Sequence, residues 1–472
     1  MSDSDLRLFD TMARGLRLFV PREPGQARVY SCGPTVYGPA HVGNFRSFLF
    51  ADILVRYLRY RGLTVTWVMN LTDIDDKIIA AASTAGLPFR EITTRYETQF
   101  LADAQTLGMS RPDVLPRASE HIEAMSALIV KLLADGHAYQ TPDGSVFFKL
   151  ASSPRYGQLA GLTPGVVAQM QTGARVEADE YGKDDIRDFA LWKGQKASEP
   201  SWDTPFGPGR PGWHIECSAM SMAHLGPTLD IHTGGVDLVF PHHTDEIAQS
   251  ESVTGVTFSR YWLHCAHLAS AGAKMSKSVG NIERVADVLG RGISPRVLRL
   301  ALIGAHYRSP LAFGEGALAT ASTQVERLDH LMGKLAAYEN AGPDNERLPV
   351  LLASARTSFE AAMNKDLNVP GALSATFKLA RELNRRLESQ TLSAGDARRA
   401  SATLRELDRV LAILPTTTPD ETPDPASADL LARRVATRAA HDWAESDRLR
   451  AELATRGWVV EDTSEGQRAH RS

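Results

Sequence analysis

The chain is 472 residues long, with 43% hydrophobic and 23% charged residues, which is typical of folded globular domains and excludes global disorder. At roughly 150 residues per domain, this length favours about three domains. The formal net charge of -4 shows no overall basic excess, so a nucleic-acid partner would have to bind a local patch. The three cysteines, Cys32, Cys217 and Cys265, are too few for a disulfide-rich secreted scaffold.

Neither a signal peptide nor a membrane-spanning helix is predicted. The first fifteen residues carry acids and lack a long apolar run, and no stretch reaches 18 consecutive apolar residues. We therefore expect a protein of a reducing compartment without a membrane partner.

The first predicted elements form a βαβ unit. Residues 27–32 (ARVYSC) alternate as a short strand, and a loop rich in Gly and Pro follows over 33–43. Apolar residues then recur at helical spacing over 45–61, with Gly62 as the stop signal. Residues 63–70 (LTVTWVMN) predict a second strand. Two strands joined by one helix imply a parallel sheet with a right-handed crossover.

The pattern of predicted helices and strands changes at two points in the rest of the chain. Residues 121–211 mix helical and strand patterns and are interrupted by prolines, which indicates an insertion. From Leu318 onward the spacing is purely helical, and the predicted helices after the first one cover 350–363, 371–388 and 397–413. Short breaks between them favour an antiparallel bundle. A stretch with four prolines over 415–427 predicts a linker before a small terminal module.

The loop before the first helix has features of a phosphate site. It holds Gly33, Gly38, His41 and Gly43, and we expect Asn44 to be the N-cap of the helix. Glycines allow close backbone approach, and the free N–H groups of a helix start attract phosphate. The pattern is neither GxGxxG nor a Walker loop. Alone, it is equally compatible with a tight turn that binds nothing.

A second basic loop lies far downstream at Lys274-Met275-Ser276-Lys277-Ser278. Two ammonium groups between Gly272 and Gly280 could neutralise charge on a departing pyrophosphate. An isolated Lys-x-x-Lys sequence is more often an ordinary solvated loop.

Residues 211–249 gather metal-binding side chains. They include Cys217 and five histidines: His214, His224, His232, His242 and His243. His242 and Glu246 are four apart and share a helix face. Their neighbours His243 and Asp245 are not expected to be ligands, because adjacent residues on a helix point about 100° apart. With Cys32 at the end of the first strand, the candidate zinc set is Cys32, Cys217, His242 and Glu246. By pattern alone, buried structural roles for these residues stay equally open.

Two of these motifs together resemble the signatures of class I aminoacyl-tRNA synthetases. Pro39–Asn44 matches the first motif, except that many members carry His where this chain has Asn44, and Lys274–Ser278 matches the second. Further segments resemble the cysteinyl-tRNA synthetase family within that class: Tyr30–Tyr37, Asn70–Ile78, Asp188–Lys193, Gly212–Met220, Phe240–His243, Glu246–Gln249, Phe359–Asn368 and Asp442–Thr463.

The resemblance implies a fold and a reaction. The fold would be α/β, with a Rossmann-like parallel-sheet catalytic domain, an inserted domain, an all-α bundle and a C-terminal anticodon-binding module. L-cysteine would react with ATP to give cysteinyl-adenylate and pyrophosphate, and the 3′-terminal ribose of tRNA(Cys) would then accept the cysteine. The family pattern also implies a cytoplasmic monomer, Mg²⁺ with ATP, and one Zn²⁺ that binds the substrate thiol.

The resemblance also implies residue roles. The zinc ligands would be Cys32, Cys217, His242 and Glu246. The catalytic residues would be His41, Lys274 and Lys277; ATP would contact Gly43, Asn44 and Lys277; and cysteine would contact Thr72, Trp213, His232 and Asp237. Zinc favours a thiolate over a hydroxyl, so the metal could distinguish cysteine from serine where shape cannot.

The expected segments follow the same resemblance. They are the catalytic domain (20–120 and 212–259), the inserted domain (121–211), a stem-contact region with the lysine loop (260–318), the bundle (319–414), the linker (415–427) and the anticodon module (428–472). In that module, Arg434, Arg438 and His441 could contact RNA backbone, although a solvated helix pair is the plainer interpretation. The family tail often ends Gly-x-x-Trp, and here Gln467, Arg468 and Ala469 follow Gly466.

Two rival functions remain at this point. A ligase that activates cysteine in the same way but transfers it to an aminosugar would share both signature loops and the zinc set. It would lack the long C-terminal region at 319–472. A non-catalytic tRNA-binding paralogue would be expected to have lost signature lysines or metal ligands, and all of them are present here.

Overall fold

The computed structural model describes residues 5–168, 187–197, 199–270, 273–274, 283–415, 425–456, 458–463 and 466–471. By internal contacts the chain separates into two compact units, Met1–Leu414 and Pro415–Ser472. No helix in the described ranges is long and apolar enough to cross a lipid bilayer.

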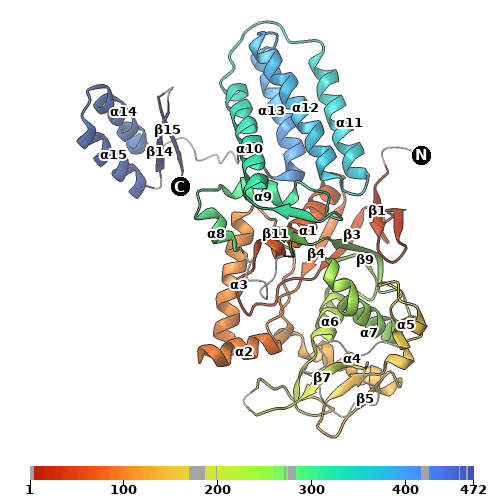
Figure 1. Ribbon diagram of the computed structural model, residues 1–472. Coiled ribbons are helices and arrows are strands. Elements are labelled where there is room, and N and C mark those ends of the chain that lie inside the picture. Colours follow the sequence, from red (N-terminus) through yellow and green to blue (C-terminus); the bar gives the residue numbers. More distant parts are fainter. Residues whose placement is uncertain are drawn as a thin grey trace. The chain divides into compact units, whose positions relative to one another are not determined.

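A four-stranded parallel sheet forms the centre of the first unit (Figure 1). Its order is β10 (Ser259–Cys265), β9 (Leu229–Gly235), β3 (Gln26–Ser31) and β4 (Thr64–Met69). Helix α1 (Val42–Tyr60) connects β3 to β4, so the predicted βαβ unit is confirmed. Val29 and Trp67 of the sheet and Leu54 of α1 are fully buried in one shared core. This sheet places the ends of β3 and β9 side by side, which matters for the site below.

An inserted region separates β4 from β9. It contains four helices: α2 (Asp76–Ala85), α3 (Phe89–Thr106), α4 (Ile122–Ala134) and α5 (Pro164–Ala168). It also contains an antiparallel sheet of β5 (Ala138–Gln140), β6 (Val146–Phe148), β7 (Phe189–Gly194) and β8 (Gly209–Pro211). Val146, Phe148 and Trp192 bury a separate core there. The chain then returns through α6 (Trp213–Leu225) and α7 (Thr244–Thr254), which pack on each other.

The remaining elements of the first unit surround the sheet. An N-terminal hairpin pairs β1 (Arg7–Asp10) with β2 (Gly15–Leu18) and contacts β10. After β10 come β11 (Leu268–Ser270), β12 (Ala273–Lys274), α8 (Val285–Leu289), α9 (Pro295–Ile303) and β13 (Leu311–Phe313). The predicted helical bundle follows as α10 (Glu315–Ala336), α11 (Leu348–Asn364), α12 (Val369–Glu388) and α13 (Ala394–Leu411), which lie side by side in Figure 1.

The second unit consists of α14 (Pro425–Ala439), α15 (Trp443–Thr455) and an antiparallel pair, β14 (Trp458–Thr463) and β15 (Gly466–Arg471). Leu430, Leu449 and Trp458 form its core. The predicted RNA contact by Arg434 is wrong, because the side chain is buried and its guanidinium donates to both carboxylate oxygens of Asp462 at 2.9 Å. Its charge completes the fold of this unit instead.

Candidate metal centre and active site

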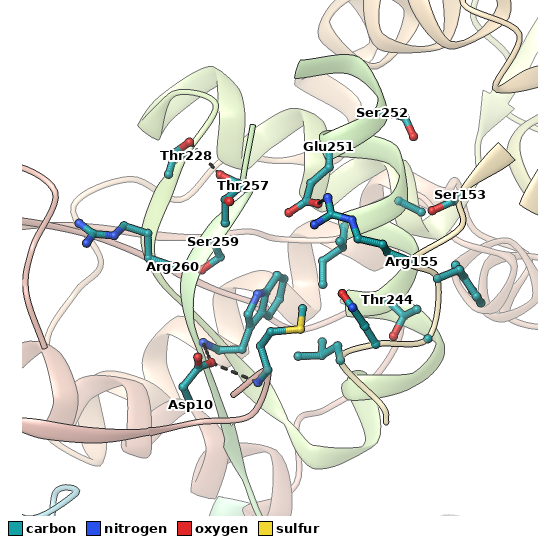
Figure 2. Close-up of a pocket in the computed structure, with 18 of the residues that line it drawn as sticks. Asp10, Ser153, Arg155, Thr228, Thr244, Glu251, Ser252, Thr257, Ser259 and Arg260 are labelled. Carbon is teal, nitrogen blue, oxygen red and sulfur yellow. Dashed lines mark hydrogen bonds and ion pairs between the residues drawn. The ribbon is translucent and has the colours of Figure 1, made fainter. Parts of the chain in front are cut away.

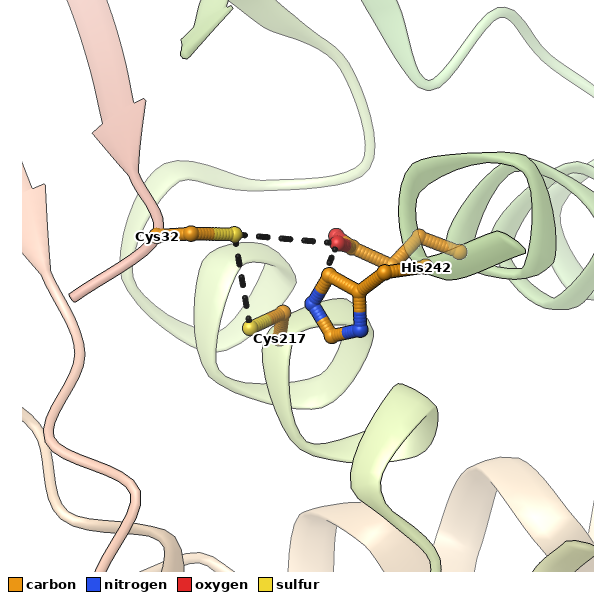
Figure 3. Close-up of side chains that lie close together, drawn as sticks. Cys32, Cys217 and His242 are labelled. Atoms are coloured by element: carbon orange, nitrogen blue, oxygen red, sulfur yellow. Dashed lines mark hydrogen bonds and ion pairs between the residues drawn. The ribbon is translucent and has the colours of Figure 1, made fainter. Parts of the chain in front are cut away.

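Four buried donor atoms converge at the carboxyl edge of the parallel sheet (Figure 3). Cys32 follows β3, Cys217 lies on α6, His242 lies in the irregular segment η5 (Val239–His243), and Glu246 lies on α7. Their donor atoms all lie within 4.8 Å of one another. The two sulfur atoms are 3.9 Å apart, and His242 Nε2 is 3.1 Å from Glu246 Oε1. The structure thus brings the whole predicted zinc set together.

The chemistry of this donor set fits zinc. Two thiolates bound to one tetrahedral zinc at about 2.3 Å lie about 3.8 Å apart, close to the sulfur–sulfur distance here. Burial raises the pKa values of Cys32 and Glu246 well above their ordinary values. In the described part of the chain, the only basic side chains that pair with Glu246 are three histidines. A divalent cation would therefore supply the positive charge that this buried site otherwise lacks.

A second group shares two of these residues. Cys32, His232, His243 and Glu246 also place donor atoms within 4.8 Å. His232 Nε2 lies 2.9 Å from Glu246 Oε2, and His243 Nε2 lies 3.3 Å from Cys32 Sγ. His243 was not predicted to be a ligand, yet its ring lies beside this carboxylate. Positions three and four residues before Glu246 are both its neighbours on a helix, so His243 and His242 flank the same carboxylate.

A hydrogen-bonded chain holds His243 from behind. Its Nδ1 lies 2.8 Å from His264 Nε2, and His264 Nδ1 lies 2.7 Å from the hydroxyl of Thr11. The three residues of this chain come from different segments: His243 from η5, His264 from β10 and Thr11 from the N-terminal hairpin. Sequence reasoning missed His264 because it lies on a strand with no motif around it. Its one signal was a polar residue between the apolar residues Leu263 and Cys265 at the end of β10.

The predicted cysteine-binding residues divide into two groups. Trp213 stacks on His242 with ring centroids 4.2 Å apart, and His232 contacts Glu246 as described above. Thr72 is buried and donates to Glu216 Oε2 across 2.9 Å; Glu216 precedes Cys217 of the cluster in sequence. The side chain of Asp237 is 56% exposed and lies 3.9 Å from His267. Asp237 therefore belongs to the rim, while the other three lie close to the cluster.

The start of α1 differs from the prediction in one detail. His41, rather than Asn44, is the N-cap: its Nδ1 accepts from the backbone N–H of Asn44, whose side chain accepts in turn from the N–H of His41. Because Nδ1 accepts a hydrogen bond, the neutral ring carries its proton on Nε2. A Cβ on Gly43 would lie 3.0 Å from His41 Nδ1, so glycine leaves room for this cap. The first turn can then present N–H groups to an anion.

The described residues on the two sides of the lysine loop are Lys274 and Glu283. The backbone of Lys274 in β12 pairs with Ala269 of β11, whereas Lys277 lies outside the described residues. When the chain resumes, the carbonyl of Glu283 accepts from the N–H of Val42 at 2.9 Å, and Arg284 forms a β-bridge with His41. The segment that follows the lysine loop in sequence therefore packs against the N-terminal turn of α1.

A cavity of about 750 Å³ lies on another side of α7 (Figure 2). It is lined by the N-terminal hairpin, residues 152–159 and the amino-terminal ends of β9 and β10, and the ion pair between Arg155 and Glu251 at 2.7 Å crosses it. Trp262 is part of the cavity lining, and its ring also stacks on the ring of His232. Parallel sheets bind ligands at their carboxyl edge, so the Cys32–Cys217–His242–Glu246 cluster and the first turn of α1 remain the candidate active site.

The parallel-sheet fold, the signature turn at the start of α1 and the sequence of the lysine loop together define a class I aminoacyl-tRNA synthetase. The family described as tRNA synthetases class I (C) catalytic domain matches residues 18–323, the DALR domain matches 358–415, and the cysteinyl-tRNA ligase anticodon binding domain matches 421–469. The chain belongs to the cysteine–tRNA ligase family, as the sequence motifs predicted.

Individual relatives agree with this assignment. The chain is 45% identical to a cysteine–tRNA ligase of Halorhodospira halophila and 43% identical to one of Symbiobacterium thermophilum, in each case over 99% of this chain and 100% of the relative. Among solved structures, a Mycobacterium tuberculosis methionyl-tRNA synthetase in complex with methionyl-adenylate has a TM-score of 0.59 at 19% identity, covering 82% of this chain and 90% of the other. That likeness concerns the fold alone.

Proposed function

We propose that this chain activates L-cysteine with ATP and transfers it to the 3′-terminal ribose of tRNA(Cys). The observation that carries this proposal is the buried Cys32–Cys217–His242–Glu246 cluster, whose Cys32 lies in the same β3–α1 connection as the N-cap residue His41. A thiol-binding metal site next to a phosphate-binding helix start is what the activation of cysteine requires. Family membership and the full-length matches support the same reaction.

The residues of the cluster would select the amino acid. They would hold Zn²⁺, which when bound stabilises the substrate thiolate in preference to a serine hydroxyl. Trp213 covers one face of His242 and keeps water from that side of the cluster. Thr72 and Glu216 form the polar contact next to Cys217 and would orient the amino acid. Selection before chemistry would make a separate editing site unnecessary.

The chain's own residues would promote adenylate formation by positioning and charge. His41 Nε2–H and the first turn of α1 would hold triphosphate oxygens, with Mg²⁺ accompanying ATP. Lys277, supported by Lys274, would neutralise the pyrophosphate as it leaves. The carboxylate of cysteine attacks the α-phosphorus, so no protein nucleophile is needed. The ribose hydroxyl of the tRNA then attacks the carbonyl of the mixed anhydride, and AMP leaves.

The decisive experiment measures ATP–pyrophosphate exchange and then offers alternative acceptors. Exchange that depends on cysteine and not on serine is expected, followed by transfer to tRNA(Cys) and no transfer to an aminosugar. Transfer to the aminosugar would support the rival ligase, and the absence of any exchange would support the non-catalytic paralogue. The presence of residues 319–472 favours the tRNA acceptor.

A further inference from the structure

A chain of polar side chains runs from the inserted region to one donor of the buried cluster. His242 Nδ1 lies 2.9 Å from Nδ1 of His214, the second residue of α6, and the two ring centroids are 5.0 Å apart, so these nitrogens face each other. His214 Nε2 lies 3.3 Å from Asp245 Oδ2 on α7. Asp245 Oδ1 in turn accepts from the hydroxyl of Tyr156. Tyr156 lies between η2 (Leu150–Ser152) and α5, so the inserted region reaches the cluster from behind His242.

This polar chain is largely shielded from water. The side chains of His242 and Asp245 are 2% and 1% exposed, and that of His214 is 15% exposed. Burial, together with the charge of Asp245, raises the pKa of Tyr156 well above its ordinary value, so the hydroxyl keeps its hydrogen and donates. Burial also raises the pKa of Asp245, but a cation in the cluster favours its ionised form, so Asp245 is a carboxylate in the loaded protein.

Asp245 sets the direction of the hydrogen bonds along this chain. A carboxylate only accepts, so the nitrogen of His214 that faces it, Nε2, carries the hydrogen of the neutral ring. Nδ1 of His214 is then an acceptor, and His242 donates to it from Nδ1. The neutral ring of His242 therefore has its lone pair on Nε2, the nitrogen that lies 3.1 Å from Glu246 Oε1. In this form an imidazole can bind a metal ion, and the partner of its other nitrogen fixes the orientation of the ring.

The contacts around His242 constrain its ring in two different ways. Trp213 stacks on the ring with planes inclined by 28° and thereby holds the ring plane. The hydrogen bond to His214 holds the rotation of the ring within that plane. Tyr156 also packs edge-on against Phe240, with ring centroids 6.2 Å apart. A phenylalanine at this position would keep the packing and lose only the hydrogen bond, so one substitution separates the two roles.

We propose that Tyr156 and Asp245 are positioning residues that act through His214 to fix the tautomer and orientation of His242 in the metal cluster. The proposal rests on the zinc-dependent function proposed above and deepens it. The inserted region would then determine how firmly the cluster holds its ion and, through the ion, how well cysteine binds. Removing the partner that orients a metal-bound imidazole typically costs about 10- to 100-fold in metal affinity or activity.

The test uses two variants of the full-length, zinc-loaded protein. Tyr156→Phe removes the hydroxyl alone. Asp245→Asn keeps the shape of the side chain, but the amide must accept from Tyr156 and therefore turns its N–H groups toward His214, which reverses the hydrogen bonds and moves the hydrogen of His242 to Nε2. Transfer of zinc to a chromogenic chelator should be about threefold or more faster in Tyr156→Phe and about tenfold or more faster in Asp245→Asn.

Two further measurements separate positioning from a loss of stability. In Co²⁺-substituted protein, the d–d absorption should change in both variants, because it reports the geometry of the ligands. In ATP–pyrophosphate exchange, the KM for cysteine should rise more than kcat falls. The matched control is Tyr139→Phe, which removes a hydroxyl that donates to Asp188 Oδ2 at 2.9 Å elsewhere in the inserted region. Its zinc transfer, cobalt spectrum and KM should equal those of the parent.

Zinc transfer and a cobalt spectrum in Tyr156→Phe equal to those of the parent would overturn the positioning role, even if Asp245→Asn fails to fold. Changes of the same size in Tyr139→Phe would also overturn it, since the effect would then come from the stability of the inserted region. Failure of the proposed function is a different result: the parent itself would bind no zinc or show no cysteine-dependent exchange, and both proposals would fall. Thermal unfolding of each variant shows whether the substitution disturbed the fold.

Discussion

Arg299 donates from Nη2 to Asp52 Oδ2 across 2.7 Å, and the two side chains are 1% and 0% exposed. The same guanidinium donates to the carbonyls of Leu411, Leu107 and Gly108. Asp52 lies on α1, Arg299 on α9, and Leu411 ends α13. The buried Asp52–Arg299 pair therefore connects α1, whose first turn is the candidate phosphate site, to α13 of the helical bundle.

Replacing Asp52 with Asn should destabilise the first unit by about 3 kcal/mol, because Arg299 would remain buried without its carboxylate. Thermal and urea unfolding measure the loss. Asp135→Asn is the matched control, since it breaks an exposed pair with Lys131 and should cost at most about 0.5 kcal/mol. Equal effects of the two changes would show that the buried pair does not connect these helices energetically.

The cysteines supply a matched pair of metal-site variants. Cys217→Ser removes a donor of the cluster, whereas Cys265→Ser changes a buried cysteine outside it. After dialysis against a chelator and reconstitution, Cys265→Ser should retain one zinc per chain and cysteine-dependent exchange. Cys217→Ser should lose both, because hydroxyl is a poor substitute for a thiolate ligand. Cysteine selectivity that persists in metal-free protein would contradict metal–sulfur discrimination.

The lysine loop should affect chemistry much more than binding. Lys277→Ala is expected to lower the rate of ATP–pyrophosphate exchange about 100-fold or more, because a positive charge that stabilises the leaving group is lost. Cysteine affinity and zinc content should not change. Lys378→Ala, at an exposed position on α12, serves as the control. An exchange rate equal to that of the parent would remove Lys277 from the mechanism.

The second unit should serve the tRNA step alone. A chain ending at Leu414 keeps every described element of the first unit, so adenylate formation should stay within about twofold of the parent. Aminoacylation of tRNA(Cys) should fall about tenfold or more, since one recognition surface is missing. Parallel assays of exchange and aminoacylation separate the two steps. Equal loss of both activities would speak against a dedicated tRNA role.

Asp103 gives a pH-dependent prediction. Partial burial on α3 raises its pKa to about 6, so the folded protein binds more protons than the unfolded chain between about pH 4 and 6. Stability therefore falls as pH rises through that window and stays lower above it. Asp103→Asn should stabilise the protein at pH 7 by about 1 kcal/mol, discounted for the exposed half of the side chain.

The advantage of Asp103→Asn should vanish below about pH 4, where both proteins carry a neutral group at this position. Melting curves at several pH values measure the difference. Glu388→Gln, which changes an exposed acid at the end of α12, is the control and should leave the pH profile of stability unchanged. A constant difference at all pH values would assign the effect to packing instead.

The periodic parts of the chain could be predicted from the sequence. The alternation at 27–32, the β-branched run at 63–70 and the apolar stripe of the bundle each reflect burial on one face, and each became the expected element. The zinc set could be proposed because two cysteines and an i, i+4 His–Glu pair are chemically distinctive. Its convergence could not be derived from spacing, since it depends on how β3, α6 and α7 pack.

Polar residues whose roles depend on tertiary partners were the ones that sequence reasoning misjudged. Arg434 has the appearance of an RNA-binding residue until Asp462 is seen beside it. His41 replaced Asn44 as the N-cap because an imidazole nitrogen can accept from the N3 backbone as an amide oxygen does. His243 contacts Cys32, which follows β3, and His264 of β10, both distant in sequence. None of these contacts leaves a local pattern.

The cluster also imposes an order on biosynthesis. Cys32 leaves the ribosome early, but its partners Cys217, His242 and Glu246 follow only after the entire inserted region has been made. The nascent chain therefore cannot assemble this set of four donors until α7 has emerged and docked. Metal capture would then act as a late checkpoint that closes a loop of more than 200 residues and adds its binding free energy to the stability of the whole catalytic sheet.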